Sequence, residues 1–194
     1  MSNKSNKEIE IQVQIENIKE LNKLLKEKAK FIGKEHQIDK YFSPNDKKFL
    51  KVRPVVEWLR LRDSSGKQSI NYKNWHHDEN ERSHYCDEYE TPVENMDQVE
   101  KIFNSLEINP IVIVDKTRKI YKYKDYEISI DSIKSLGNFV EIEYKGKHTT
   151  KSPAKITDEM IKFLKDLNCG KISRNYVGYP FQMLFPKEVK YETF

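Results

Sequence analysis

The amino-acid sequence predicts an α+β fold in which about eight antiparallel strands close into a β-barrel that forms a tunnel, with helices packed outside. Most segments between turns alternate polar and apolar residues, which is the pattern of a strand with two different faces. Three further stretches carry apolar residues at helical spacing and offer enough apolar surface to cover the outside of such a sheet. The polar faces of the strands are also sorted by the sign of their charge, which indicates that they point into one interior.

The length of the chain fits one domain over residues 1–194 with a single core. Residues 1–7 are polar and are expected to form a disordered leader, whereas the aromatic tail over 177–194 is expected to pack on the body. The 35 Lys and Arg residues nearly balance the 31 Asp and Glu residues, so the net charge of +4 does not by itself indicate a nucleic-acid partner.

The composition also bears on compartment. No apolar run approaches the ~20 residues needed to span a bilayer, and the first residues contain no apolar stretch typical of a secretory signal. Only two cysteines occur, Cys86 and Cys169, and they lack a metal-binding spacing. We therefore expect a reduced cytoplasmic protein without a membrane partner. The histidines His76, His77 and His84 are irregularly spaced in a polar segment near Cys86, which favours an exposed loop over a zinc site.

The first half of the chain is predicted to contain five strands and one helix. Residues 8–15 read EIEIQVQI, a strict alternation that predicts a strand. A helix is expected over 17–31, where apolar residues recur at helical spacing, and Gly33 is expected to end it. The later strands surround a turn at 64–66 and a polar excursion at 76–83, and they are predicted over 37–42, 57–63, 68–75 and 85–93.

The second half of the chain is predicted to contain two helices and three strands. A helix is expected near residues 96–106, with Asn95 as its N-cap and Asp97 in the first turn, where negative charge is favourable. Thr157 is predicted to cap the other helix, which Gly170 ends. Strands are predicted over 111–123, 126–131 and 139–145, with a turn at 136–138.

The polar faces of these strands are the main functional signal. Because side chains alternate across a strand, residues two apart share a face. An ordinary solvated face would mix Lys, Glu, Thr and Ser, whereas these faces carry charges of one sign. The acidic faces hold Glu8 and Glu10, Glu88 and Glu90, Asp131, and Glu141 and Glu143; the basic faces hold Arg60 and Arg62, Lys73, and Lys116 and Arg118.

Such sorted charges require ligands. Carboxylates at this spacing repel one another unless a cation lies between them, and their hard oxygens suit Mg²⁺ or Mn²⁺. Clustered Arg and Lys side chains need a polyanion, which Arg binds through paired hydrogen bonds to phosphate oxygens. A triphosphate with bound metal satisfies both groups together. A barrel of about eight strands has an interior wide enough for one small ligand.

At these residues the chain resembles the CYTH family, which is named for class IV adenylate cyclase and thiamine triphosphatase. The opening EIEIQ resembles the ExExK signature, and SIDSIKSLGNFVEIE, residues 129–143, is the most specific match. The ending SRNY, residues 173–176, resembles the Arg-Tyr ending of the cyclase branch. Other blocks follow in family order at 37–43, 58–62, 72–73, 87–90 and 115–121, so that the resemblance covers residues 8–176.

The resemblance implies a tunnel that binds triphosphate compounds with a divalent metal, and a homodimer in the cyclase branch. It implies metal ligands at Glu8, Glu10, Asp131, Glu141 and Glu143. It implies triphosphate contacts at Gln12, Arg60, Arg62, Lys73, Lys116 and Arg118, of which Lys73, Lys116 and Arg118 are the catalytic candidates. Additional candidates are Glu88, Glu90, Arg174 and Tyr176. The sequence departs from the signature at Gln12, which replaces the lysine and supplies no positive charge.

Three classes of function follow from this interpretation. The first is an enzyme that converts ATP to cyclic AMP and pyrophosphate, or a triphosphatase that hydrolyses thiamine triphosphate, inorganic triphosphate or a nucleoside triphosphate. The second is a non-catalytic protein that binds triphosphate or polyphosphate, which the substitution at Gln12 favours. The third is an RNA-binding barrel. It ranks last, because such a barrel would carry exposed basic and aromatic residues on a shared face instead of sorted carboxylate pairs.

Overall fold

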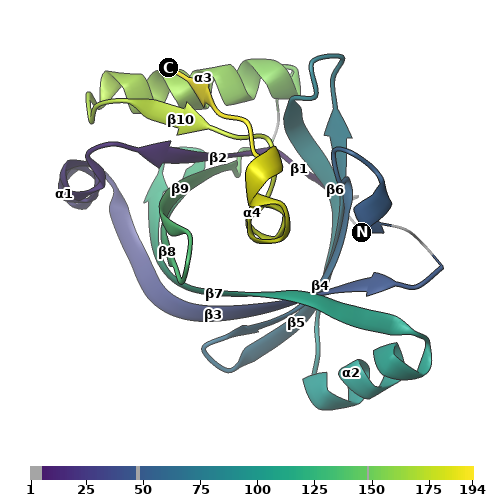
Figure 1. Cartoon of the computed structure of the whole chain (residues 1–194). Helices are drawn as coiled ribbons and strands as arrows, with labels where there is room; N and C mark the ends of the chain where they lie inside the picture. Colours follow the sequence, from purple (N-terminus) through teal and green to yellow (C-terminus); the bar gives the residue numbers. More distant parts are fainter. Residues whose placement is uncertain (1–5, 47–48, 148) are drawn as a thin grey trace.

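Antiparallel strands dominate the computed structural model, which describes residues 6–46, 49–147 and 149–194 (Figure 1). In chain order the strands are β1 (Lys7–Glu8), β2 (Glu10–Ile15), β3 (Lys30–Pro44), β4 (Glu57–Ser64), β5 (Lys67–His77), β6 (Ser83–Pro92), β7 (Ile108–Tyr123), β8 (Tyr126–Ile133), β9 (Gly137–Tyr144), β10 (Ile172–Arg174) and β11 (Glu192–Thr193). The helices are α1 (Ile18–Lys28), α2 (Met96–Ser105), α3 (Pro153–Asp166) and α4 (Tyr179–Leu184), with short 3₁₀ turns at Phe49–Lys51 and Pro186–Glu188. The predicted α+β class with an antiparallel sheet is confirmed.

The sheet is open, and the prediction of a closed barrel of about eight strands is wrong for the described residues. Their 11 strands run in the order β1-β6-β5-β4-β3-β7-β8-β9-β2-β10-β11. A closed ladder would need β2 to pair with β6. Instead β2 pairs with β9 on one edge and with β10 on the other, while β6 pairs with the two residues of β1.

The open sheet nevertheless curls around a centre (Figure 1). β1 and β2 are separated by Ile9 alone, and they pair with β6 and β9, which lie far apart in the strand order. One stretch of chain therefore joins the two sides of the curled sheet without completing the hydrogen-bond ladder. The inner faces of the strands converge as they would in a barrel.

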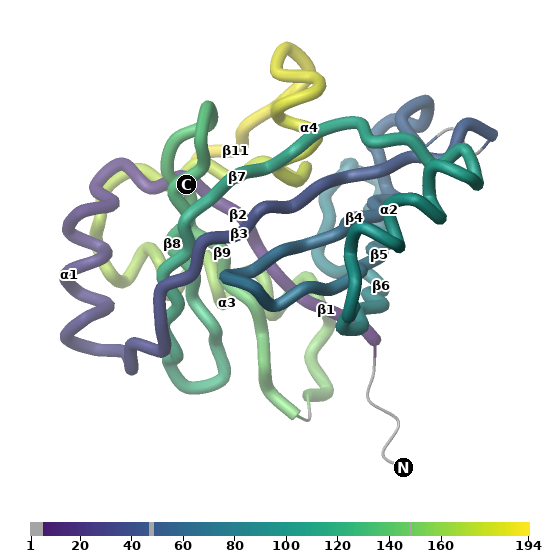
Figure 2. The backbone as a smooth tube through the Cα atoms, turned by 90° about the horizontal axis from the view of Figure 1, so that it is seen from below, coloured from purple at the N-terminus to yellow at the C-terminus, as the bar shows by residue number. Residues whose placement is uncertain are grey.

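The largest core cluster lies between the sheet and two helices. The apolar faces of β2, β8 and β9 pack against α1 and α3. Leu21 and Leu25 from α1 and Met160 and Leu164 from α3 are at most 1% exposed, and each such side chain stabilises the fold by about 1.5–3 kcal/mol. α1 and α2 lie at opposite ends of the molecule (Figure 2). Because the apolar side chains face outward to the helices, the polar side chains face inward.

The predicted end of the first helix is corrected. α1 ends at Lys28, and the chain continues through Gly33 within β3 instead of ending a longer helix there. The reason is long-range pairing, since β3 is bonded to β7 from Lys30 to Pro44. Asn95 caps α2 as predicted, with its side chain accepting a hydrogen bond from the Gln98 backbone N–H.

The start of α3 also differs from the prediction. Ser152, and not Thr157, is its N-cap, because Pro153 at the first helical position is already constrained to a helical φ. Thr157 is buried within the helix. Its hydroxyl donates to the Ala154 carbonyl and contacts His84 Nδ1 at 2.7 Å.

The two ends of the chain contribute contacts to the sheet. Of the predicted leader, residues 1–5 lie outside the described residues, whereas the Asn6 carbonyl accepts a hydrogen bond from the Glu88 N–H. In the tail, Tyr179 and Phe181 are buried in a cluster with Trp58 and Phe139. None of the helices in the described part of the chain is long and apolar enough to cross a membrane.

Candidate active site

The inner faces of the curled sheet surround a polar cavity of about 160 Å³. α4 contributes Tyr179 and Pro180 to its lining, and the adjoining Gly178 lies beside them. All but three of the site residues predicted from the sequence line this cavity: Glu8, Glu10, Gln12, Arg60, Arg62, Lys73, Glu88, Glu90, Lys116, Arg118, Glu141 and Glu143. Asp131, Arg174 and Tyr176 are not among the lining residues.

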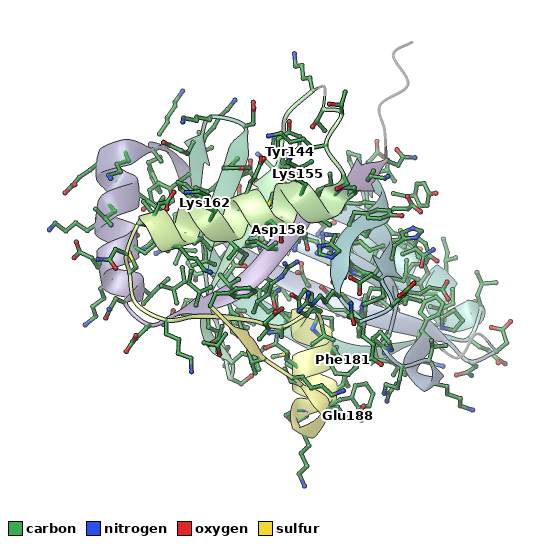
Figure 3. All side chains as sticks on the ribbon, turned by 90° about the horizontal axis from the view of Figure 1, so that it is seen from above. Tyr144, Lys155, Asp158, Lys162, Phe181 and Glu188 are labelled. Atoms are coloured by element: carbon green, nitrogen blue, oxygen red, sulfur yellow. The ribbon has the colours of Figure 1, made fainter. Side chains whose placement is uncertain are left out.

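A larger groove of about 1180 Å³ lies elsewhere, between α1, α3 and the turn joining β7 to β8. Tyr144 and Lys162, labelled beside α3 in Figure 3, line it. It contains none of the predicted site residues, and Lys162 already pairs with Asp166 at 2.8 Å. We therefore place the candidate site in the smaller cavity, where acidic and basic side chains are concentrated, although the groove is larger.

The acidic side of the cavity consists of four glutamates on β1, β2 and β9. Glu10 lies directly opposite Glu143 in the ladder between β2 and β9. Lys73 from β5 pairs with Glu8, and its Nζ lies 3.4 Å from Glu10 Oε2. The remaining glutamate, Glu141, accepts from Arg118 at 2.8 Å. Each carboxylate faces the cavity, so the alternation of the sequence placed them correctly on one surface.

These carboxylates outnumber the cations between them. Burial opposes ionisation of Glu8, but the charge of Lys73 lowers its pKa to about 2. Burial and the Glu8 carboxylate raise the pKa of Glu10 well above its usual range. The same two causes raise the pKa of Glu143 to about 7. Two carboxyl groups that resist ionisation are therefore the sign of an acidic cluster with room for another positive charge.

The other acidic pair lies on β6. Glu88 accepts from the Asn71 amide at 2.6 Å and lies 3.8 Å from Lys73. Glu90 is exposed and accepts from the Ser69 hydroxyl at 2.9 Å. Glu88 therefore belongs to the shell around Lys73, whereas Glu90 lies at the edge of the cavity.

The basic side of the cavity is organised by Asp39, a residue that the sequence analysis missed. Its carboxylate is fully buried and accepts from Arg62 at 2.5 and 2.7 Å. Arg60 lies 3.7 Å and Lys116 3.5 Å from the same carboxylate. Burial opposes ionisation, yet these three cations hold the pKa of Asp39 far below its usual range. The signal available in the sequence was that Asp39 is an acidic residue within a predicted strand, in a chain whose other strands carry several inward-facing cations.

Arg118 is oriented by Asp131, which lies behind it. The two guanidinium nitrogens donate to the two Asp131 oxygens at 2.7 and 2.6 Å, and the Tyr179 hydroxyl donates to Asp131 at 2.9 Å. Both carboxylate oxygens are thus engaged, and Asp131 is fully buried. In this arrangement Asp131 positions Arg118 instead of joining the glutamates predicted to bind metal.

Among the described residues that line the cavity, Lys116 is the one basic side chain whose pKa is lowered toward neutral pH. It is 3% exposed. Burial lowers its pKa, and the Arg118 charge lowers it further, to about 8, despite nearby Asp39 and Asp131. A lysine with such a pKa has a neutral amine form available near pH 8, and this form can accept a proton.

Arg174 and Tyr176 lie beside the cavity. They line a small adjoining pocket of about 30 Å³ that also touches Gln12. Arg174 donates to the Ser83 carbonyl at 2.9 Å, and its guanidinium lies 4.4 Å from the Tyr176 ring centre. The Tyr176 hydroxyl donates to Glu192 on β11. These contacts connect β10 and the residues that follow it to β6 and β11.

The donor set fits a hard divalent cation by its chemistry, because Glu8, Glu10, Glu141 and Glu143 supply oxygen ligands and two of them have raised pKa values. Among the residues that the structure describes, no three acidic, histidine or cysteine side chains already form a metal cluster. Glu8 and Glu141 are turned to Lys73 and Arg118 instead. Binding of an ion would require these glutamates to exchange partners.

Comparison with known proteins supports the sequence resemblance. The sequence profile of the CYTH domain matches residues 6–176. A Methanocaldococcus jannaschii protein named provisionally as an adenylate cyclase is 34% identical over 165 residues, covering 84% of this chain and 91% of that protein.

Two solved structures are similar in fold. The PH1819 protein of Pyrococcus horikoshii matches with a TM-score of 0.76 at 24% identity, covering 93% of this chain and 99% of that chain. A Hippeastrum structure, described as a provisional adenylyl cyclase with a dominant triphosphatase activity, matches with a TM-score of 0.63 at 18% identity, covering 93% and 95%. The profile match, together with the M. jannaschii relative, shows that the chain belongs to the CYTH domain family.

Proposed function

We propose that this protein is a metal-dependent enzyme that binds a nucleoside triphosphate in the polar cavity and acts on its phosphate chain. One observation carries the proposal: within a single cavity, buried Arg60, Lys116 and Arg118 face glutamates that are not fully neutralised. A triphosphate supplies the negative charge that the basic side needs, and its metal supplies the positive charge that the acidic side needs.

Glu8, Glu10, Glu141 and Glu143 would hold Mg²⁺ or Mn²⁺, which when bound acts as a Lewis acid that offsets phosphate charge. Arg60, Arg62 and Arg118 would bind the phosphate oxygens. Asp39 and Asp131 keep these guanidinium groups in place before the ligand arrives, so little reorganisation is needed at the moment of reaction.

Formation of cyclic AMP is our leading reaction. The ribose 3′ oxygen would attack the α-phosphorus, the bond from that phosphorus to the bridging oxygen would break, and pyrophosphate would leave. The neutral form of Lys116 would accept the hydroxyl proton, which its lowered pKa permits. The provisional cyclase name of the M. jannaschii relative and the SRNY ending support this reaction.

Hydrolysis of the triphosphate is the second candidate, and the activity described for the Hippeastrum structure favours it. A water molecule would attack the γ-phosphorus, the bond from that phosphorus to the β–γ bridging oxygen would break, and phosphate and the corresponding diphosphate would be released. The same positioning and charge serve both reactions, because phosphoryl transfer depends mainly on orientation and electrostatics. Binding without turnover, which the substitution at Gln12 favours, is the remaining alternative.

These functions are separated by one product assay. The protein is incubated with ATP, GTP, thiamine triphosphate or inorganic triphosphate, in Mg²⁺ or Mn²⁺, and cyclic nucleotide, pyrophosphate and phosphate are resolved. Cyclic AMP with equal pyrophosphate would establish the cyclase, and phosphate alone would establish the hydrolase. Tight binding without product would leave a binding protein, and absence of both binding and product would refute the proposal.

Replacing Glu8 or Glu141 by glutamine is expected to weaken activity and apparent metal affinity by about 10-fold or more, since even residues that merely support metal ligands have effects of this size. The measurement is the rate as a function of metal concentration at saturating triphosphate. Glu100→Gln is the matched control, because Glu100 on α2 pairs with Lys40 of β3 and lies outside the cavity. Unchanged metal dependence in both cavity variants would show that the glutamates do not bind the ion.

A further inference from the structure

Gln12, where the family signature has lysine, is held by the C-terminal helix. The Gln182 amide on α4 donates to Gln12 Oε1 at 2.8 Å, and Gln182 is 3% exposed. The Tyr191 hydroxyl in turn donates to Gln182 Oε1 at 3.3 Å. A lysine at position 12 has no acceptor for the Gln182 amide. Glutamine therefore suits a contact with α4 that the signature residue could not make in this form.

The helix that makes this contact lies at one end of the cavity. In Figure 1 α4 overlaps the space that the curled sheet encloses, and the perpendicular view places it to one side of the strands, away from β1 (Figure 2). Tyr179 and Pro180 line the cavity. The Tyr179 ring is 5.1 Å from Lys116 Nζ, and its hydroxyl donates to Asp131. α4 is thus in contact with the residues that would bind the phosphate chain.

The opposite end of the cavity is more open. Along β9, Glu141 lies opposite Gln12, and Glu143 lies opposite Glu10, one step further from α4. Lys145 follows, and its side chain is 48% exposed. Across the cavity, Glu90 is also exposed. The lining therefore changes from buried at the α4 end to solvated at the end near Glu143 and Lys145.

We propose that the hydrogen bond between Gln12 and Gln182 is a latch that holds α4 as the closed end of the cavity. A linear phosphate chain then enters the cavity with its free terminus first and cannot pass through to the other side. The terminal phosphate lies at the α4 end beside Tyr179, and the inner part of the phosphate chain lies along Lys116 and Arg118. The remainder of the ligand leaves through the end near Glu143. The inference rests on the proposed function, because it assumes that the cavity binds phosphate chains.

Closure at one end is tested with three inorganic ligands in Mg²⁺ by calorimetry: tripolyphosphate, long-chain polyphosphate, and the same long chain with both ends blocked as phosphoramidates. We expect the first two to bind and the blocked chain not to bind. The long chain should take up two protein molecules, one per end, whatever its length. Binding of the blocked chain, or a stoichiometry that grows with chain length, would overturn closure while leaving triphosphate binding intact. Failure of tripolyphosphate itself would overturn both proposals.

The latch is tested with Gln12→Leu, Gln182→Leu and the double variant, because leucine keeps most of the side-chain volume while removing the hydrogen bond. Amide hydrogen exchange over residues 179–185 should quicken by about five-fold in either single variant, the size expected for one neutral hydrogen bond. The double variant should be no faster, since both changes break one contact.

The matched control for the latch is Gln14→Leu. Gln14 lies two residues along β2 and pairs with Ser173 on β10, and it does not line the cavity. Exchange in α4 should remain at the wild-type rate in this variant. Wild-type exchange in all three latch variants, or additive acceleration in the double variant, would refute the latch. If a variant does not fold, Gln182→Met, which keeps a similar length and has no amide, replaces it and should give the same acceleration.

Discussion

Replacing Arg118 by alanine is expected to weaken triphosphate binding by roughly 10²-fold or more and to lower the free energy of unfolding by about 3–5 kcal/mol. Both effects have the same origin. Arg118 is 8% exposed and is the bidentate partner of Asp131, which is fully buried. Without the guanidinium, the cavity loses a preorganised phosphate donor, and Asp131 keeps a buried charge without its main partner.

The two effects of this substitution can be separated. Binding of tripolyphosphate in Mg²⁺ is measured by calorimetry, and stability is measured by urea denaturation. Adding Asp131→Asn to Arg118→Ala removes the uncompensated charge, so stability should recover while binding does not. Lys119→Ala is the matched control, because Lys119 is the neighbouring residue on the opposite face of β7 and does not line the cavity. Wild-type affinity in a folded Arg118→Ala protein would show that the arginine does not contact phosphate.

The metal-free protein is expected to lose about 1–3 kcal/mol of stability from Glu143 as the pH rises from about 5 to about 8. Burial and the Glu8 carboxylate raise the pKa of Glu143 from 4.5 to about 7. Between these values the folded protein binds more protons than the unfolded chain, so stability falls as the pH rises. The raised pKa of Glu10 acts in the same direction. Mg²⁺ should reverse the loss, because a bound cation offsets the charges that the protons had removed.

The measurement is urea denaturation between pH 5 and 8, with a chelator or with Mg²⁺. Burial lowers the pKa values of His77 and His84, and these groups act in the opposite direction below about pH 6.5. The difference between wild type and Glu143→Gln therefore isolates the contribution of Glu143. The free energy of unfolding of wild type minus that of Glu143→Gln should decline with rising pH in the chelator. The decline should be smaller in Mg²⁺. A pH-independent difference would contradict the acidic cluster as described.

The candidate site was largely predictable because its residue types repeat with the period of a strand. Alternation placed Glu8 with Glu10 and Glu141 with Glu143 on shared faces, and the sorted charges indicated that these faces point inward. In the structure all four line one cavity. The helices α1, α2 and α3 were predictable for a similar reason, since each carries an apolar stripe, whereas α4 was not predicted as a helix. The end of α1 was misplaced because the long ladder between β3 and β7 outweighed the local helical pattern.

The partners of the inward side chains were not predictable in the same way. Asp39 gathers three cations that come from β4 and β7, and this arrangement depends on which strands become neighbours of β3. Asp131 lies on the inward face of its strand, as the other acids do. However, it lies opposite Arg118 in the ladder, and its carboxylate oxygens accept hydrogen bonds from that arginine. Strand order and register thus decide whether an inward acid lines the cavity or anchors a cation.

The sequence by itself therefore determined the secondary structure in outline, the inward face of each strand, the sorted charges and membership of the CYTH family. These properties are local, because side-chain alternation depends only on neighbouring residues. The tertiary structure alone decided that β10 occupies the edge of β2 needed for closure, that α4 reaches Gln12, and that Asp39 organises the basic side. Such contacts join residues far apart in the chain, and they follow from packing and pairing of the whole sheet.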